Sequence, residues 1–229
     1  MITPENIKKR TLELGADKCG IASADSFVEA PKGFHPRDIF SLCKSVVVFI
    51  KQMPIDAIFA ENPIPYTHTA YKMYEEMDRI AMEMCRYMQK NGAKAVIVPS
   101  DVPYMHWDAE NMYGHGILSL KHAAVLAGLG IMGKSTILIN QDLGNMTYIG
   151  AALTDRDLPP DSAVKDFSCP PRCRKCIDVC PGQAMDGVTV NQKRCRERSF
   201  FKTGRGWDLY NCSECRKVCP YRLGTRGTK

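Results

Sequence analysis

Eight of the eleven cysteines lie in the last 61 residues of the chain, in two runs that each end in Cys-Pro. The first run reads CPPRCRKCIDVCP, from Cys169 to Pro181, and the second is Cys195 followed by CSECRKVCP, which ends at Pro220. Close Cys-x-x-Cys steps let one short loop bind three corners of a 4Fe–4S cube, and the cysteine before the proline then binds the other cluster. The pattern therefore predicts two 4Fe–4S clusters and electron-transfer chemistry.

This rule divides the cysteines into two predicted ligand sets. One cluster takes Cys169, Cys173, Cys176 and Cys219, and the other takes Cys180, Cys195, Cys212 and Cys215. The step from Cys169 to Cys173 holds three residues, two of them proline, where two residues are usual. Cys169 is therefore the ligand that the pattern supports least, and a cluster without it would carry a labile iron open to substrate.

Zinc sites and disulfides are the alternatives for so many cysteines. Tetrahedral zinc usually takes paired Cys-x-x-Cys steps, and a run of four that ends in Cys-Pro and occurs twice does not suit it. Disulfides form in oxidising compartments, whereas the N-terminus MITPENIKKR lacks the apolar stretch of a signal peptide. The longest strongly apolar run, Ser45 to Ile50, is too short to cross a membrane. These observations favour clusters in a reducing cytoplasm, with no membrane partner.

Predicted helices and strands alternate before the cysteine runs. Helices are predicted from Thr3-Pro4-Glu5 to Gly15, from a Thr67 cap to Asn91, and over 117–127, with strands over 19–22, 46–51, 95–98, 136–140 and 146–154. A polar and aromatic loop over 100–115 lies between them. The alternation predicts an α/β (α+β) layered domain with a mixed sheet over residues 1–163. A proline-containing linker then leads to a ferredoxin-like domain over 164–229.

The string GLGIMGKS at residues 128–135 matches both G-x-G-x-x-G and the P-loop pattern. Both patterns need a strand before the glycines and a helix after them, so that phosphate lies at the helix N-terminus. The predicted order here is helix first and strand second, which argues against nucleotide binding. Two interpretations remain open. One is a helix-to-strand corner, and the other is a turn that approaches a large ligand through Gly128, Gly130, Gly133, Lys134 and Ser135.

Positive charge is concentrated near the end of the sequence. The formal net charge is +6, yet from Lys193 to Lys229 eleven Lys or Arg face only three acids. The simplest explanation is that these cations offset the anionic clusters. The alternative is a docking face for an acidic electron donor or for RNA phosphates.

The order and spacing of these blocks resemble the epoxyqueuosine reductase family. The resemblance is carried by AGLGIMGKSTILIN, YIGAALTD, CRKCIDVCPGQAM, NQKRC and CSECRKVCP, between Ala127 and Pro220. The chain is similar, more distantly, to the catalytic core of reductive dehalogenases. The resemblance implies a cobalamin-binding domain related in fold to flavin nitroreductases, followed by the two-cluster domain. Electrons from the clusters would reduce the cobalamin, which reduces the substrate while a nearby acid supplies a proton.

The resemblance also implies a position for the proton donor. Epoxyqueuosine reductases carry an aspartate ahead of the glycine turn, and the matching position here is Gly114, with His115 beside it. Reductive dehalogenases use a tyrosine, so Tyr113 and His115 are the candidate catalytic residues, and a histidine suits proton transfer near neutral pH. An ordinary polar loop residue is the alternative for each. The same loop also contains Tyr104, His106 and Asp108.

Three functions follow from the sequence. The first is a cytoplasmic, cobalamin-dependent iron–sulfur reductase of the epoxyqueuosine reductase type, supplied by a low-potential donor such as ferredoxin or flavodoxin. The second is an electron carrier or activator, whose first domain binds a corrinoid or a flavin or docks a partner protein. The third, a tRNA-binding module, rests on the basic C-terminal residues alone.

Overall fold

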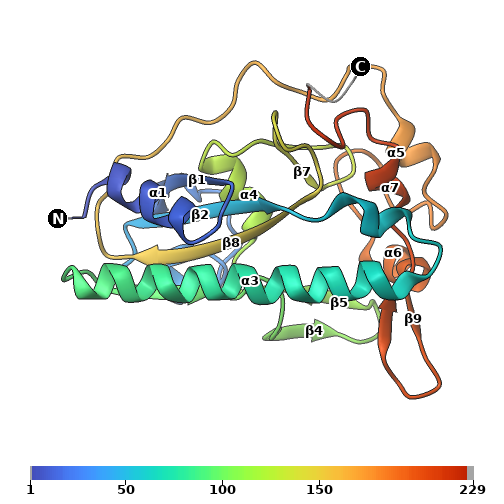
Figure 1. The fold of residues 1–229 in the computed structure, drawn as a ribbon, viewed down its shortest axis with the longest axis horizontal. Helices are drawn as coiled ribbons and strands as arrows, with labels where there is room; N and C mark the ends of the chain where they lie inside the picture. Colours follow the sequence, from blue (N-terminus) through green and yellow to red (C-terminus); the bar gives the residue numbers. More distant parts are fainter. Residues whose placement is uncertain (1, 226–229) are drawn as a thin grey trace.

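The computed structural model describes residues 2–225. Its centre is a four-stranded sheet formed by β1 (Lys18–Ser23), β2 (Ser45–Gln52), β8 (Thr147–Thr154) and β3 (Ala95–Val98), in that spatial order (Figure 1). Every pair of neighbouring strands in this sheet is antiparallel. The class of the fold is thus α/β in the broad sense, with an antiparallel sheet.

The prediction of a mixed sheet is wrong for a reason of strand order. Strands β2 and β3 both pair antiparallel with β8, so they run parallel to one another and are joined by the long helix α3 (Pro63–Lys90). This is the crossover unit that the alternation of helix and strand indicates. However, β8 comes later in the chain and lies between the two strands. Local periodicity carries no information about such an insertion, because strand order depends on long-range pairing.

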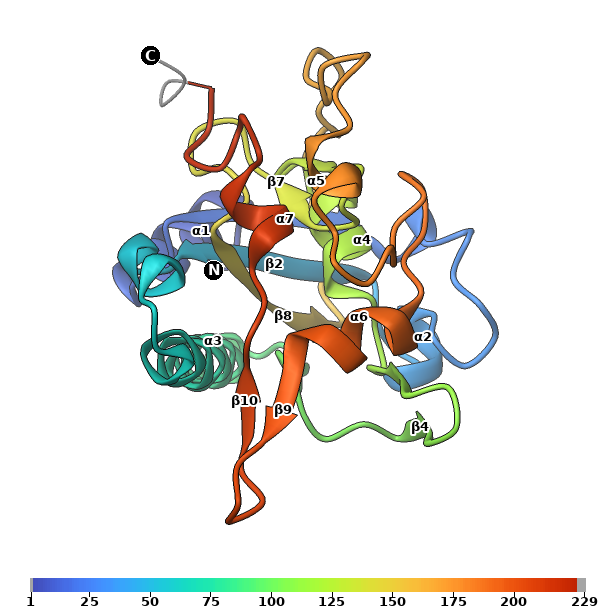
Figure 2. The ribbon, with the colours of Figure 1, turned by 90° about the vertical axis from the view of Figure 1, so that its right-hand side faces the viewer.

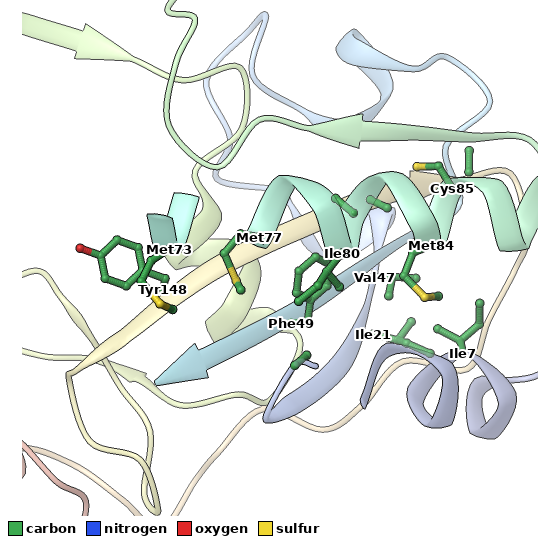
Figure 3. Packing of buried hydrophobic residues seen from close by; sticks show 14 of the residues in the cluster. Ile7, Ile21, Val47, Phe49, Met73, Met77, Ile80, Met84, Cys85 and Tyr148 are labelled. Carbon is green, nitrogen blue, oxygen red and sulfur yellow. The ribbon is translucent and has the colours of Figure 1, made fainter. Parts of the chain in front are cut away.

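Helices cover both faces of the sheet. Helices α1 (Pro4–Glu13) and α3 pack on one face, and α4 (Leu120–Leu126) packs on the other (Figure 1). Strand β2 is therefore apolar at successive positions: Val47 and Phe49 face α3, whereas Val48 faces α4. Figure 3 shows the α3 side of this core, where the helix places its apolar stripe over the strands. Four methionines of α3 are buried in this core: Met73, Met77, Met84 and Met88.

The long helix begins one turn earlier than predicted. Asn62 is the N-cap, and its Oδ1 accepts a hydrogen bond from the Ile64 amide. Prolines are tolerated in a first helical turn because the amide they lack has no helical partner there. Thr67, the predicted cap, lies inside the helix, where its hydroxyl donates to the Pro63 carbonyl and accepts from the Tyr210 amide.

Most other predicted elements are present with shifted bounds. The predicted strand over 136–140 is reduced to β7 (Leu138–Ile139), which pairs with β6 (Ile131–Met132) in a hairpin. Sequence analysis missed a second hairpin, formed by β4 (His106–Asp108) and β5 (Tyr113–His115). It also missed three short helical segments: η1 (Ala24–Ser26), α2 (Pro36–Ile39) and η2 (Ile55–Phe59).

The cysteine-rich part is built from short pieces around loops. They are α5 (Lys175–Asp178), α6 (Gln192–Ser199), β9 (Phe200–Lys202), β10 (Asp208–Tyr210) and α7 (Glu214–Lys217). Helices α5 and α7 pack together, and the β9–β10 hairpin projects beyond them (Figure 2). We refer to residues 166–225 as the cysteine module.

An extended segment joins the sheet to the cysteine module. It leaves β8, crosses over the molecule and reaches the module at the other end (Figure 1). The predicted domain boundary between residues 163 and 164 falls in this segment and remains a prediction. Met1 and residues 226–229, which complete the two predicted domains, lie outside the described residues. Within residues 2–225, no helix is long and apolar enough to cross a membrane.

Candidate functional site

Four cysteines surround one cavity in the cysteine module. They are Cys169, Cys173, Cys176 and Cys219, the set that sequence analysis assigns to one cluster. The other lining residues are Lys134, Ser135, Ile139, Pro170, Pro220 and Tyr221. We call these four cysteines the first quartet. The irregular step after Cys169 does not remove that residue from the cavity.

Local structure brings the first quartet together from two distant segments. Cys173 follows a turn in which its amide donates to the Pro170 carbonyl, and Cys176 lies in α5. Cys219 comes from beyond α7, which packs against α5. Burial, with a smaller effect from the nearby thiols of the other three members, raises the pKa of Cys219 to about 11. Thiols this close to one another would all be thiolates only with a bound cation or cluster to stabilise them.

The other four cysteines form a second group, the second quartet. Burial raises the pKa of Cys195, on α6, and the adjacent thiols of Cys180 and Cys212 raise it as well. Burial likewise raises the pKa of Cys215 to about 11, with Cys195 and Cys212 among its neighbours. These contacts join the cysteines that sequence analysis assigns to the other cluster. Cys176 of the first quartet also lies near Cys215, so the two groups are adjacent.

The donor chemistry fits clusters better than single ions. No group of three or more His, Cys, Asp or Glu side chains within residues 2–225 converges to hold one metal ion. A zinc ion needs its sulfur ligands about 2.3 Å from a single point. The first quartet instead lines the wall of a cavity, which suits a larger body bound at several corners. All eleven cysteines are free thiols in this structure.

Two cations beside the second quartet were not predicted from the sequence. The Arg216 guanidinium lies near Cys215 and over the Tyr148 ring, at 5.9 Å from its centroid, and donates to the Asn145 carbonyl. Lys121, on α4, lies near Cys195 and donates to the Thr136 carbonyl at 2.7 Å. Neither cation forms an ion pair with a described carboxylate. The position of Arg216 directly after a ligand cysteine was an available signal.

The three glycines of the turn pack closely against other segments of the chain. A Cβ at Gly128 would lie 2.4 Å from the Ser162 carbonyl oxygen, and one at Gly130 would lie 2.3 Å from that of Ile139. A Cβ at Gly133 would lie 2.6 Å from the Ile139 side chain. The place that a Cβ would take at each of the three glycines is filled by the chain itself, so packing alone requires glycine at these positions. Their predicted role in binding a cofactor stays a prediction. Helix α4 ends before this string, β6 lies inside it and β7 follows it, so the string lacks the strand-before and helix-after order of a nucleotide loop.

Lys134 and Ser135, the two polar residues of that turn, face the first quartet instead. Both line its cavity, and Ser135 is buried. The Lys134 Nζ lies 3.0 Å from the carbonyl oxygens of Pro171 and Cys173 and 3.5 Å from that of Pro170. Lys134 thus contacts the loop of the predicted cluster, and Ser135 lines the cavity beside it.

Comparison with known proteins identifies the relatives of this chain. No family model matches it. It is 33% identical over 142 residues to an epoxyqueuosine reductase of Staphylococcus aureus, covering 57% of this chain and 36% of that protein. It is 30% identical over 250 residues to an epoxyqueuosine reductase of Bacillus subtilis, covering 96% of this chain and 64% of that protein. This chain is a relative of the epoxyqueuosine reductases.

The fold agrees with this relationship. The structure of epoxyqueuosine reductase from Streptococcus thermophilus matches 98% of this chain and 67% of that one, with a TM-score of 0.68 at 21% identity. A catabolic reductive dehalogenase in complex with 3-bromo-4-hydroxybenzoic acid matches 98% of this chain and 32% of that one, with a TM-score of 0.74 at 20% identity. The resemblance to both groups is confirmed. The chain spans about a third of the length of the first curated epoxyqueuosine reductases that it matches.

Gly114, the position at which the resemblance places the acid of epoxyqueuosine reductases, lies in the β4–β5 hairpin. Gly114 exchanges two hydrogen bonds with the side-chain amide of Gln192 on α6, at 3.1 and 3.3 Å. A Cβ at Gly114 would lie 3.2 Å from the Trp107 ring, so an aspartate at this position would require that ring to move. Arg196, also on α6, lies over the Trp107 ring at 5.1 Å from the ring centroid. The hairpin is thus held against the helix that bears Cys195.

The two candidate proton donors lie at the surface of that hairpin. Tyr113 is exposed, and its ring contacts His115 edge-on at a centroid distance of 4.3 Å. His115 in turn packs beside Phe34, as does His106 of the facing strand. Both candidates therefore lie among aromatic side chains, and no described carboxylate is hydrogen-bonded to either.

A different acidic pair lies deeper in the same loop. The Tyr104 hydroxyl donates to the Asp101 carboxylate at 2.9 Å. Burial raises the pKa of both groups, and the mutual contact raises that of Tyr104 while lowering that of Asp101. The sequence placed Tyr104 in this loop, but Asp101 was missed because nothing in its spacing distinguishes it.

Proposed function

We propose that this chain is an iron–sulfur reductase of the epoxyqueuosine reductase type, which passes electrons through two 4Fe–4S clusters to a cobalamin at which a substrate is reduced. The observation that carries the proposal is the division of eight cysteines into two neighbouring quartets. The quartets have the membership that the interleaved ligand pattern requires, with Cys219 in the first and Cys180 in the second. An electron carrier with one cluster would need only four of them.

The surroundings of the quartets support electron transfer between them. Cys176 and Cys215 are neighbours, so clusters bound at the two sites would lie close together. Lys121 and Arg216 place two positive charges beside the second quartet. A nearby cation favours the more negative, reduced form of a cluster, since the attraction between charges is strong at low dielectric.

The cobalamin part of the proposal depends on the relatives. One of the similar structures is that of a reductive dehalogenase, and it suggests a mechanism for B12-dependent dehalogenation by that enzyme. The backbone turn of residues 128–133 and the adjoining Lys134 and Ser135 are the residues that would lie near a cobalamin, with the Cβ side of each glycine packed against the chain itself. When bound, cobalamin supplies a strongly reducing cobalt centre.

Anaerobic reconstitution followed by iron and sulfide counting tests the clusters. We expect about eight irons per chain, the content of two 4Fe–4S clusters. Replacing Cys219 by Ala should weaken the same cluster signal as replacing Cys173, and Cys180→Ala should weaken the same signal as Cys212→Ala. Cys85→Ala is the control, because Cys85 lies in the sheet core away from the quartets. Fewer than about five irons in the unmodified chain would contradict the two-cluster proposal.

Titration of the reconstituted protein with cobalamin, followed by absorbance, tests the second part. Tight binding with a changed cobalt spectrum supports the reductase. Full iron content with no cobalamin binding, and with bound flavin instead, would overturn the cobalamin assignment and leave the clusters in place.

An electron carrier without substrate chemistry is the second candidate function. It is favoured by Gly114, which stands where the resemblance places the relatives' acid, and by the setting of the two candidate donors, an exposed Tyr113 and a half-buried His115 packed beside Phe34. If the chain is a reductase that uses these residues, Tyr113→Phe with His115→Ala should reduce substrate turnover and leave cluster reduction by dithionite unchanged. Unchanged turnover would remove both from the mechanism.

Partners follow from the same proposal. Clusters need a low-potential donor such as ferredoxin or flavodoxin, and basic side chains on α6 and the β9–β10 hairpin offer it a positive surface. A related epoxyqueuosine reductase has been solved with an epoxyqueuosine-modified tRNA stem loop. RNA is the less favoured partner here, since Gly114 replaces the acid of the tRNA-acting relatives.

A further inference from the structure

Lys134 is a cation with an unusual set of partners. Its ammonium group lies 3.0 Å from the carbonyl oxygens of Pro171 and Cys173 and 3.5 Å from that of Pro170. It forms no ion pair with a described carboxylate. Two of the acceptors lie in the irregular step between Cys169 and Cys173, and the third is the carbonyl of Cys173 itself. Lys134 also lines the cavity that the first quartet surrounds.

The support under Lys134 is rigid. It lies in the turn between β6 and β7, which is closed by hydrogen bonds from the Gly133 amide to Ile137 and from the Thr136 amide to Gly133. Lys121 binds the Thr136 carbonyl from α4. The ammonium group is therefore presented from the first part of the chain in a fixed position.

The loop it contacts needs such a partner. Pro170 and Pro171 have no amide hydrogen, so this segment offers carbonyl acceptors but few donors. An anionic cluster in the cavity would be repelled by carbonyl oxygens left without partners. A cation that binds these oxygens removes the repulsion and holds the longer loop in one shape. Groups of this kind, which orient metal ligands without binding the metal, typically change metal affinity about 10- to 100-fold when removed.

We infer that Lys134 is a positioning residue for the first cluster, which fixes the three-residue step so that Cys169 and Cys173 can bind it together. The inference rests on the proposed function, since it presumes a cluster at the first quartet. Lys134 of the GLGIMGKS string would then support the cluster site rather than bind phosphate.

The test compares four forms of the full chain, each reconstituted anaerobically. They are the unmodified chain, Lys134→Met, Lys134→Arg and Lys175→Met. Lys175 is exposed and lies between Cys173 and Cys176, so its replacement removes the same charge near the same cluster without touching the loop carbonyls. The readouts are iron content, the electron paramagnetic resonance signal of each cluster, and the rate at which a chelator removes iron.

We expect Lys134→Met to lose the first cluster's signal selectively, with its iron released about 10 to 100 times faster, while the second cluster is retained. Lys134→Arg, which keeps a cation with several donors, should restore most of the retention, and Lys175→Met should match the unmodified chain. Circular dichroism of the metal-free forms checks that Lys134→Met folds as Lys175→Met does.

Equal release rates for Lys134→Met and Lys175→Met would overturn the inference. So would equal loss of both clusters, or a failure of Lys134→Arg to restore retention. If the unmodified chain itself binds no cluster at the first quartet, the proposed function is wrong and the inference falls with it. That outcome is recognised from the unmodified chain alone.

Discussion

At the scale of single residues, the absence of a side chain at Gly150 explains how closely α3 packs on the sheet. Gly150 lies in the centre of β8, and a Cβ there would be 2.4 Å and 2.6 Å from ring atoms of Phe49 and 3.3 Å from Met77 Cβ. The ring of Phe49 thus occupies the volume that any other residue at position 150 would need. Figure 3 shows Phe49 and Met77 next to each other at this point of the core.

Gly150→Ala should therefore destabilise the protein by overpacking. We expect a loss of about 1–3 kcal/mol in the free energy of unfolding, the usual cost of inserting a methyl group into a packed core. Chemical denaturation of the metal-free chain, followed by circular dichroism, measures it. Gly204→Ala is the matched control, because no atom lies within 4 Å of a Cβ at that position. Similar midpoints for the two variants would contradict the packing described here.

The cluster ligands are the residues that sequence could predict best. Few kinds of site use cysteines at this fixed short spacing, so the spacing directly predicts which cysteines belong to which quartet. Lys121 and Asp101 could not be found in this way, because a single charged residue has no distinguishing period or spacing. The neighbours of Lys121, which are Thr136 and Cys195, come from elements far away in the sequence.

At the scale of elements, α3 connects the sheet to the cysteine module. The middle of the helix packs on the sheet, whereas its first turns contact β10. Thr67 accepts a hydrogen bond from the Tyr210 amide at 2.9 Å, and the Tyr71 hydroxyl donates to the Asp208 carbonyl at 3.1 Å. Figure 2 shows β10 beside the end of this helix.

Thr67→Val should loosen the hairpin from the helix. The substitution keeps the size of the side chain but leaves the Tyr210 amide without its acceptor, at a cost of about 1–3 kcal/mol. Hydrogen exchange at β9–β10 should therefore become faster, with little change at β2 or β8. Thr67→Ser keeps the hydroxyl and should exchange at the rate of the unmodified chain. Equal rates for the Val and Ser variants would show that this bond does not hold the hairpin.

Elements with strong local signals were predicted well, and those defined by tertiary contacts were not. The apolar run of β2 and the stripe of α3 are visible in the sequence because burial imposes a period on them. The start of α3 was misplaced, since two prolines suggest a loop unless Asn62 is recognised as a cap. The β4–β5 hairpin and the place of β8 depend on partners outside their own segments.

At the scale of the whole molecule, burial is unevenly distributed. The sheet and its helices contain two clusters of buried side chains. Among the described residues after Leu158, the only buried ones are Ala184, Ser213, Cys219 and Gly224. So small a core cannot hold a module of this length together, and bound metal supplies the missing stability in many small domains of this kind.

Removal of the clusters should therefore unfold the module and leave the rest folded. After treatment with a chelator and a reductant, we expect hydrogen exchange to become fast over residues 166–225. Protection should persist in β2, β8 and α3, whose amides are enclosed by their own core. The protein with its clusters intact is the control. Protection of the module that survives the loss of iron would show that protein contacts alone maintain it.

The last cysteine of each run, Cys180 or Cys219, belongs to the quartet of the other run. This arrangement affects when the clusters can be inserted during synthesis of the protein. Cys169, Cys173 and Cys176 are synthesised before Cys219, so the first site has only three thiols until translation reaches Cys219. The second site likewise holds Cys180 while it waits for Cys195, Cys212 and Cys215. Each site becomes complete only after the second run has been synthesised. Cluster insertion would then follow translation, and both sites would become ready for iron at nearly the same moment.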